Sequence, residues 1–106
     1  QFFLGQLMLF LPTLHLISSS LRIALQEQNQ AALFHWVHRL KGSTATLSLP
    51  SLASAAASLE KMLFPEITPQ WPILQDHVEQ LQNLIQQAIF AIETRVNAEK
   101  GSLHAG

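Results

Sequence analysis

The sequence predicts an all-α protein: an antiparallel up-down-up-down four-helix bundle with a short extra helix at its N-terminus. Three observations support this prediction. The 106-residue chain is rich in Leu, Ala and Gln but has only four Gly and no Tyr, a composition typical of helices rather than sheets. Its apolar residues recur at intervals of three and four, which is the period of an amphipathic helix. The connections between these stripes are short, which favours antiparallel neighbours.

The first apolar stripe lies near the N-terminus. It consists of Phe3, Leu7, Phe10, Leu14, Ile17 and Leu21. Because proline removes a helical N–H and clashes with the preceding turn, we expect Pro12 to divide this stretch into a short helix and a longer one. Polar residues such as Gln6 and Ser18–Ser20 interrupt the run of about 20 apolar residues that a membrane span requires. We therefore expect a packed soluble helix and no membrane insertion of this domain.

Three further stripes predict the remaining helices. They are Leu33, Val37, Leu40, Thr44 and Leu47; then Leu52, Ala56, Leu59 and Leu63; then Leu74, Val78, Leu81, Ile85, Ala88 and Ile92. The polar segment Glu27–Gln30 separates the first two helices. Pro50 is expected to open the third helix, where its missing N–H costs nothing. Thr68 is expected to cap the last helix, with Pro69 as the first helical residue.

Length and composition restrict the class of protein. We expect a single domain over residues 1–106, with its core at about residues 8–96 and a frayed tail over 97–106, since single cores usually hold about 100–150 residues. Six Lys and Arg balance seven Asp and Glu for a net charge of −1, which argues against nucleic-acid binding. The absence of cysteine excludes disulfides and Cys-based zinc sites. We expect a monomer.

The candidate functional residues lie on the outward face of the second helix, away from its core stripe. At about 100° per residue, His38 and Gly42 lie on the face opposite the stripe, and Lys41 follows His38 by one turn. A glycine inside a helix costs about 0.5–1 kcal/mol relative to alanine. At an exposed position, this cost has a functional explanation if another molecule must approach the backbone beside His38. Simple tolerance of a poor helix former is the alternative.

These three residues together suit a phosphoryl acceptor. A solvent-exposed imidazole is largely neutral at pH 7 and is then nucleophilic. Lys41 can neutralise and hydrogen-bond a phosphoryl group on that ring, and Gly42 leaves room for a partner. The sequence shows no Gly-rich phosphate loop for ATP. The pattern therefore predicts a group acceptor and donor whose partner supplies the catalysis.

The run His38–Leu47 resembles the signature of histidine-containing phosphotransfer (HPt) domains, His-x-Leu-Lys-Gly-Ser-x-Ala-x-x-Leu-Gly. Phe10–Leu14 and Leu49–Glu60 are also similar to segments of that family, so the resemblance covers roughly residues 8–64. Two positions depart from the family pattern. Ser48 replaces a glycine, which leaves the end of the second helix open, and Val37 replaces an alanine at a core position.

The resemblance implies that His38 is the phosphorylated residue, through Nε2. It implies that Lys41 stabilises the phosphoryl group and that Gly42 admits a receiver domain. The implied function is phosphorelay signalling: His38 accepts a phosphoryl group from a receiver aspartate and passes it to a response regulator. No cofactor is expected on this chain, since the divalent cation belongs to the receiver. The abrupt N-terminus favours the C-terminal module of a hybrid sensor kinase, so we expect this domain in the cytoplasm, with a parent that can be anchored in the inner membrane.

Other residues on the second helix have less specific predictions. We expect Phe34, His35, Arg39 and Ala45 to contribute to docking, although Phe34 is equally consistent with a boundary core position. A metal pair of His35 and His38 is disfavoured, because two histidines are too few for a closed zinc site. Glu60 lies on the third helix, where it can face the helix that carries His38, and no role is assigned to it.

Two other functions compete with phosphotransfer. A helical interaction or dimerisation module without phosphotransfer is favoured by the apolar first helix, because exposed apolar patches often mark interfaces. A dimerising kinase core would need an adjoining ATP-binding domain.

Overall fold

The computed structural model describes residues 2–46 and 49–105 of the chain. These residues form helices α1 (Phe2–Gln26), α2 (Gln30–Thr46), α3 (Pro50–Lys61) and α4 (Trp71–Ala105), and they contain no strand. The all-α prediction is confirmed. Leu47 and Ser48, which were predicted to be a core position and the end of the second helix, lie outside the described residues.

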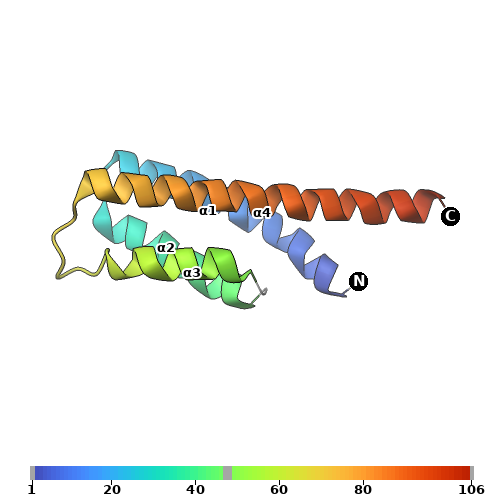
Figure 1. Ribbon diagram of the computed structural model, residues 1–106, viewed down its shortest axis with the longest axis horizontal. Coiled ribbons are helices and arrows are strands. Elements are labelled where there is room, and N and C mark those ends of the chain that lie inside the picture. Colours follow the sequence, from blue (N-terminus) through green and yellow to red (C-terminus); the bar gives the residue numbers. More distant parts are fainter. Residues whose placement is uncertain (1, 47–48, 106) are drawn as a thin grey trace.

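The helices pack side by side in an elongated bundle of 57 × 22 × 17 Å. Each helix contacts its neighbours in the ring α1–α2–α3–α4, and α4 contacts α1. Figure 1 shows the chain reversing direction from each helix to the next, with α2 and α3 lying together below α1 and α4. The C-terminal part of α4 extends beyond the ends of α2 and α3.

The predicted apolar stripes form the core of the bundle. Leu14, Ile17, Leu21, Leu33, Val37, Leu40, Ala56, Leu63, Val78 and Ile85 are fully buried. Thr44 is also fully buried, and its hydroxyl donates to the carbonyl of Leu40 at 2.7 Å, which satisfies a polar group that would otherwise destabilise the core. On α4 the stripe differs slightly from the prediction, since Ile89 is buried and Ala88 is half-buried.

The predicted division at Pro12 is wrong. Helix α1 is continuous from Phe2 to Gln26 with Pro12 inside it. Leu7, Phe10 and Leu14 are buried on both sides of the proline, so a break would remove part of the core. Pro12 and Met8 are exposed, and water can therefore solvate the Met8 carbonyl that loses its helical partner.

Helix α1 also meets the requirements of a membrane span. By length and composition alone, its stretch Gly5–Gln26 is long and apolar enough to cross a bilayer, a test that core helices and signal sequences pass as well. In this structure one face of the stretch packs into the bundle, through buried residues from Leu7 to Ala24. That packing is the arrangement expected of a core helix.

Local interactions set where α2 begins. The Asn29 side chain accepts a hydrogen bond from the backbone N–H of Ala32 at 3.1 Å, which caps the helix. Before it, Gln28 has a φ of 51°, and the N–H groups of Gln28 and Asn29 donate to the carbonyls of Leu25 and Ala24. This is the left-handed termination that usually contains glycine. It turns the chain sharply from α1 into α2.

Prolines and backbone hydrogen bonds mark the first turns of α3 and α4. Pro50 opens α3, as predicted, and its cap residue Leu49 makes no side-chain capping bond. The expectation that Thr68 and Pro69 begin the last helix is wrong, because α4 begins at Trp71. The first carbonyl in its hydrogen-bond ladder is that of Gln70, which accepts from the N–H of Leu74 at 2.9 Å. Pro72 then lies in the first turn, where proline is tolerated.

Helix α4 continues to Ala105 and so includes most of the segment 97–106, which the sequence predicted to be a frayed tail. The tail contains no proline, and each residue added to an existing helix gains one hydrogen bond for one fixed residue. Helix α4 therefore extends past Val96, the last residue shown to be buried.

Candidate functional site

Helix α2 presents His38 to solvent because its opposite face is fixed in the core. Val37 and Leu40, on either side of His38 in the sequence, are fully buried. The His38 side chain is 63% exposed. Helical geometry then places Phe34, Lys41 and Gly42 within about 60° of His38 around the helix axis. The site is therefore built on the outward face of a rigid helix.

A carboxylate from α3 completes the site. Glu60 is buried, with only 9% of its side chain exposed, and it accepts hydrogen bonds from two residues of α2. Its Oε2 contacts Nδ1 of His38, and its Oε1 accepts from Nζ of Lys41 at 2.7 Å. Both carboxylate oxygens are thus engaged, and Glu60 connects the two residues that the sequence had singled out.

The charge of Glu60 determines that Nδ1 of His38 carries a hydrogen. The hydrogen bond from Lys41, and then that from His38, hold the pKa of the Glu60 carboxyl below its usual value, against the opposing effect of burial. Glu60 is therefore ionised at neutral pH, and an ionised carboxylate only accepts hydrogen bonds. Nδ1 of His38 must carry a hydrogen to make this contact. In a neutral imidazole the lone pair then lies on Nε2, on the opposite side of the ring from Glu60.

Lys41 is held beside the imidazole, and its ion pair with Glu60 does not occupy all of its hydrogen-bond donors. Its side chain is 37% exposed, and its ammonium makes the ion pair with Glu60. An ammonium has three donors, so hydrogens remain available for a phosphoryl group on His38. The sequence prediction placed Lys41 near His38, and the structure adds that Glu60 fixes the position of its charge.

Gly42 has no packing reason to be glycine. A Cβ added to this residue meets nothing within 4 Å, and the described glycines have no positive φ that would require a glycine. Gly42 is exposed on the turn that follows His38. Neither the backbone conformation nor the core explains this residue, whereas the approach of another molecule would.

An aromatic ring covers part of the imidazole. The Phe34 ring stacks on the His38 ring with centroids 5.9 Å apart and an interplanar angle of 14°. Phe64, in the connection between α3 and α4, lies against Phe34 at 5.9 Å with a tilt of 58°. Phe34 is half-buried and packs against the core. It is therefore both a boundary residue and part of the histidine site.

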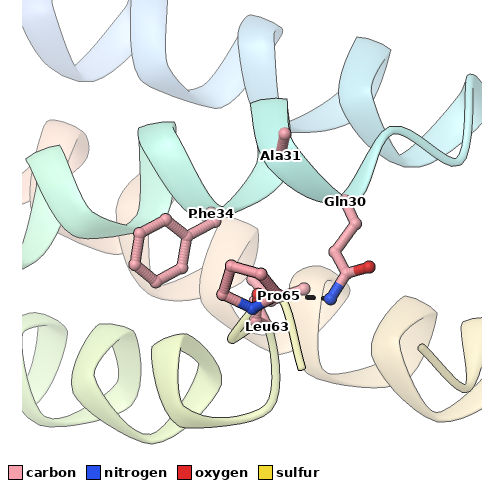
Figure 2. A pocket seen from close by; sticks show the side chains of 5 residues that line it. All are labelled: Gln30, Ala31, Phe34, Leu63 and Pro65. Carbon is pink, nitrogen blue, oxygen red and sulfur yellow. Dashed lines mark hydrogen bonds between the residues drawn. The ribbon is translucent and has the colours of Figure 1, made fainter. Parts of the chain in front are cut away.

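A small apolar pocket lies beside Phe34, as Figure 2 shows. It has a volume of about 220 Å³ and is lined by Gln30, Ala31, Phe34, Leu63 and Pro65. The Gln30 side chain reaches from α2 to the α3–α4 connection (Figure 2). There its amide nitrogen donates to the carbonyls of Leu63, Phe64 and Ile67 at 3.3, 3.0 and 3.0 Å. Gln30 thus ties this connection to the start of α2.

The remaining predicted docking residues lie at the edge of the site. His35 is exposed and meets the Trp36 ring edge-on at 5.0 Å. The Arg39 guanidinium lies over the same ring at 5.6 Å, a cation–π contact. Ala45 is exposed one turn beyond Lys41. His35 and Arg39 therefore surround Trp36, whereas the contacts of His38 are with Phe34 and Glu60.

Glu60 is the residue to which the sequence assigned no role. One signal was available: Glu60 follows the core position Ala56 by four residues, so it falls on the buried face of its helix. A buried carboxylate requires a cationic or hydrogen-bonding partner. Among the residues that the structure describes, no group of three or more His, Asp or Glu is arranged to hold a metal ion.

The fold and the site together define a helical bundle with an exposed histidine on one face, in contact with a buried carboxylate and close to a lysine. The chain matches the Hpt domain family over residues 7–90 and belongs to that family. Hpt domains are phosphotransfer modules of two-component phosphorelays: they carry a phosphohistidine, interact with receiver domains and response regulators, and have no kinase activity of their own. Comparison with the curated proteins and with the solved structures gave no match.

Proposed function

We propose that this domain is a phosphorelay intermediate in which His38 takes a phosphoryl group from a receiver aspartate and passes it to a response regulator. The observation that supports this most is the double hydrogen bond to Glu60. One buried carboxylate orients the imidazole through Nδ1 and holds the Lys41 ammonium beside it. A surface histidine without a function would not need this arrangement.

The proposed reaction is an in-line displacement at phosphorus. The Nε2 lone pair attacks the phosphorus of the aspartyl phosphate, the N–P bond forms, and the P–O bond to the aspartate breaks. The carboxylate leaves with the electron pair, and the ring keeps its Nδ1 hydrogen and becomes an imidazolium. Glu60 accepts the hydrogen bond from Nδ1 and faces the new positive charge. Transfer to the next receiver reverses these steps.

The other residues of the site support binding of the phosphoryl group and the partner. Lys41 offers donors to phosphoryl oxygens, whose charge spreads as the transition state forms. Gly42 leaves the backbone of α2 open to the receiver. The divalent cation that stabilises the transition state belongs to the receiver, so this chain needs no cofactor. Phe34, His35, Arg39 and Ala45 form the surrounding docking surface.

The direct test is phosphotransfer from a phosphorylated receiver domain. We expect acid-labile, base-stable label on the wild-type chain and none on His38→Gln. His15→Gln is the matched control, because it removes an exposed imidazole on α1, outside the site and the docking surface. Label that persists on His38→Gln, or that disappears in His15→Gln, contradicts the assignment.

The wider setting is also part of this proposal. We expect the module to act in the cytoplasm, at the C-terminus of a hybrid sensor kinase, and as a monomer. Donor and acceptor must use the same face in turn, which requires a small and transient interface. Hpt domains are typically soluble and cytoplasmic, which agrees with this setting.

One observation favours a second candidate function, an interaction or dimerisation module. Leu9, Leu16 and Ile23 are 80%, 49% and 53% exposed and follow one another at seven-residue intervals on α1. Such apolar faces often mark interfaces. Analytical ultracentrifugation at micromolar concentration separates the two candidates in part: a stable dimer that Leu16→Glu dissociates supports the second function, and a monomer counts against it.

A further inference from the structure

We infer that Phe34 stabilises the phosphorylated state of His38 by placing its ring face against the imidazolium. This inference rests on the proposed phosphotransfer at His38. Its basis is geometric, since the two rings lie 5.9 Å apart and within 14° of parallel. These values fall within the range of offset stacked rings. Phe34 precedes His38 by four residues, the spacing at which side chains on one helix meet.

The Phe34 ring is held in place by its surroundings. Phe64 packs against it from the α3–α4 connection at 5.9 Å. That connection is itself fixed to α2, because the Gln30 amide donates to the carbonyls of Phe64 and Ile67 at 3.0 Å each. Phe34 also contacts the core. The stacking geometry is therefore present before phosphorylation and does not have to be formed during transfer.

The charge of the imidazole changes during the reaction. In the form of His38 that attacks phosphorus, the ring is neutral and carries a hydrogen on Nδ1. Once Nε2 bonds to phosphorus, the ring keeps that hydrogen and carries a positive charge. A cation within about 6 Å of an aromatic face is attracted by the ring quadrupole. Phe34 therefore interacts more strongly with the phosphorylated ring than with the free one.

This difference affects the phosphoryl-exchange equilibrium. The equilibrium constant for exchange between free domains depends only on the stabilities of their phosphorylated and unphosphorylated forms. A docking contact made by Phe34 changes the rate and the apparent KM, but it leaves that constant unchanged. The measured ratio of phosphohistidine to phosphoaspartate thus distinguishes stabilisation of the product from docking.

The experiment measures this ratio after the domain and its receiver have equilibrated, at dilutions where the ratio no longer depends on concentration. Phe34→Leu retains apolar bulk and removes the aromatic face. We expect it to lower the phosphohistidine ratio about two- to fivefold, the equivalent of about 0.5–1 kcal/mol. Phe34→Trp retains an aromatic face and should keep or raise the wild-type ratio. Trp36→Leu is the matched control, because it removes a half-buried aromatic ring of the same helix whose contacts are with His35 and Arg39 rather than His38.

Each outcome has a defined meaning. A wild-type ratio in Phe34→Leu overturns the inference, even if transfer is slower, and assigns Phe34 to docking. An equal loss in Trp36→Leu also overturns it, because general packing would then explain both effects. Circular dichroism checks folding, and Phe34→Met serves if the leucine variant does not fold. A wild-type domain that takes no label at all overturns the proposed function itself, and this inference with it.

Discussion

Glu60 on α3 accepts a hydrogen bond from Nδ1 of His38 on α2, across 22 positions of the sequence. The side chains differ greatly in exposure, 9% for Glu60 and 63% for His38. A buried charge thus controls a ring that reaches into solvent. Because Glu60 also holds Lys41, one residue on α3 positions both the imidazole and the ammonium on α2. Packing of α3 against α2 is therefore a requirement of the site as well as of the fold.

Glu60→Gln should reverse the tautomer of His38. Lys41 can only donate hydrogen bonds, so it should take the amide oxygen of the new glutamine and leave the amide NH2 facing Nδ1. The imidazole would then accept at Nδ1 and carry its hydrogen on Nε2, without a lone pair for attack. We expect phosphotransfer to slow by about 10- to 10⁴-fold, the upper limit being the cost of the same replacement in a Ser-His-Asp triad.

The measurement is single-turnover transfer from a phosphorylated receiver, with the tautomer read from the ¹⁵N shifts of the imidazole. Glu60→Asp is the comparison variant, because it keeps the negative charge and shortens the side chain by one methylene group. Its rate should lie between those of the wild type and the glutamine variant. A Glu60→Gln protein that transfers at the wild-type rate would show that the carboxylate does not set the tautomer.

Stability should depend on pH through Glu60. The folded protein holds the pKa of this carboxyl below its usual value, mainly through Lys41 and then through His38. Between the two values the unfolded chain binds more protons than the folded one, so the free energy of unfolding rises with pH. The stabilisation should be complete above about pH 4.3, the ordinary glutamate value. It should be lost as the pH falls through the lower, folded value.

Urea unfolding between pH 3 and pH 6 tests this dependence. The wild type should lose stability on acidification more steeply than Glu60→Gln, which has no carboxyl to protonate at this position. Lys41→Met should also be less steep, because removing the largest cause of the shift moves the pKa of Glu60 upward. Parallel curves for all three proteins would mean that Glu60 does not contribute to acid unfolding.

The sequence predicted most of the bundle and the exposed half of the site. Apolar spacing is a property of one helix at a time, so the stripes through Leu14, Val37 and Leu59 could be read without a structure. His38, Lys41 and Gly42 belong to one helix face for the same reason. Glu60 lies on another helix, and its role depends on how α3 packs against α2. Local spacing contains no direct information about that packing.

At Pro12 the sequence-based prediction was wrong because the local rule for proline does not take tertiary packing into account. A rule that holds for isolated helices predicted a break, but tertiary burial of Leu7, Phe10 and Leu14 keeps α1 continuous. The start of α4 differs from its predicted position for a related reason. Several prolines near one another offered more than one possible first turn, and in the structure the first turn is the one whose N–H groups donate to the Gln70 carbonyl.

Pro12→Ala should therefore stabilise the protein. Proline in a helix interior is about 3 kcal/mol less favourable than alanine, and Pro12 is exposed, so little packing is lost. Part of the cost is already relieved by solvation, and we expect a gain of about 1–3 kcal/mol in the free energy of unfolding. Denaturant unfolding measures this gain. Thr13→Ala is a control for mutation at the neighbouring position, and a destabilised Pro12→Ala would contradict the explanation given for the continuous helix.

Gly42→Ala should change stability and function in opposite directions. The added methyl meets no atom within 4 Å, and alanine is about 0.5–1 kcal/mol more favourable than glycine inside a helix. The free energy of unfolding should rise by about that amount. If Gly42 is retained so that a receiver can approach His38, the same methyl should raise the KM for transfer from the receiver, and Gly42→Leu should raise it further.

Thermal unfolding and transfer kinetics on the same preparations separate the two effects. Ser43→Ala is the matched control, since it also places an alanine on this turn of α2 but leaves the glycine in place. A stabilised Gly42→Ala protein with unchanged KM would mean that the glycine is merely tolerated by the helix. A destabilised one would mean that space around Gly42 is needed within the domain. Only a more stable protein that transfers more weakly assigns the open backbone at Gly42 to the partner.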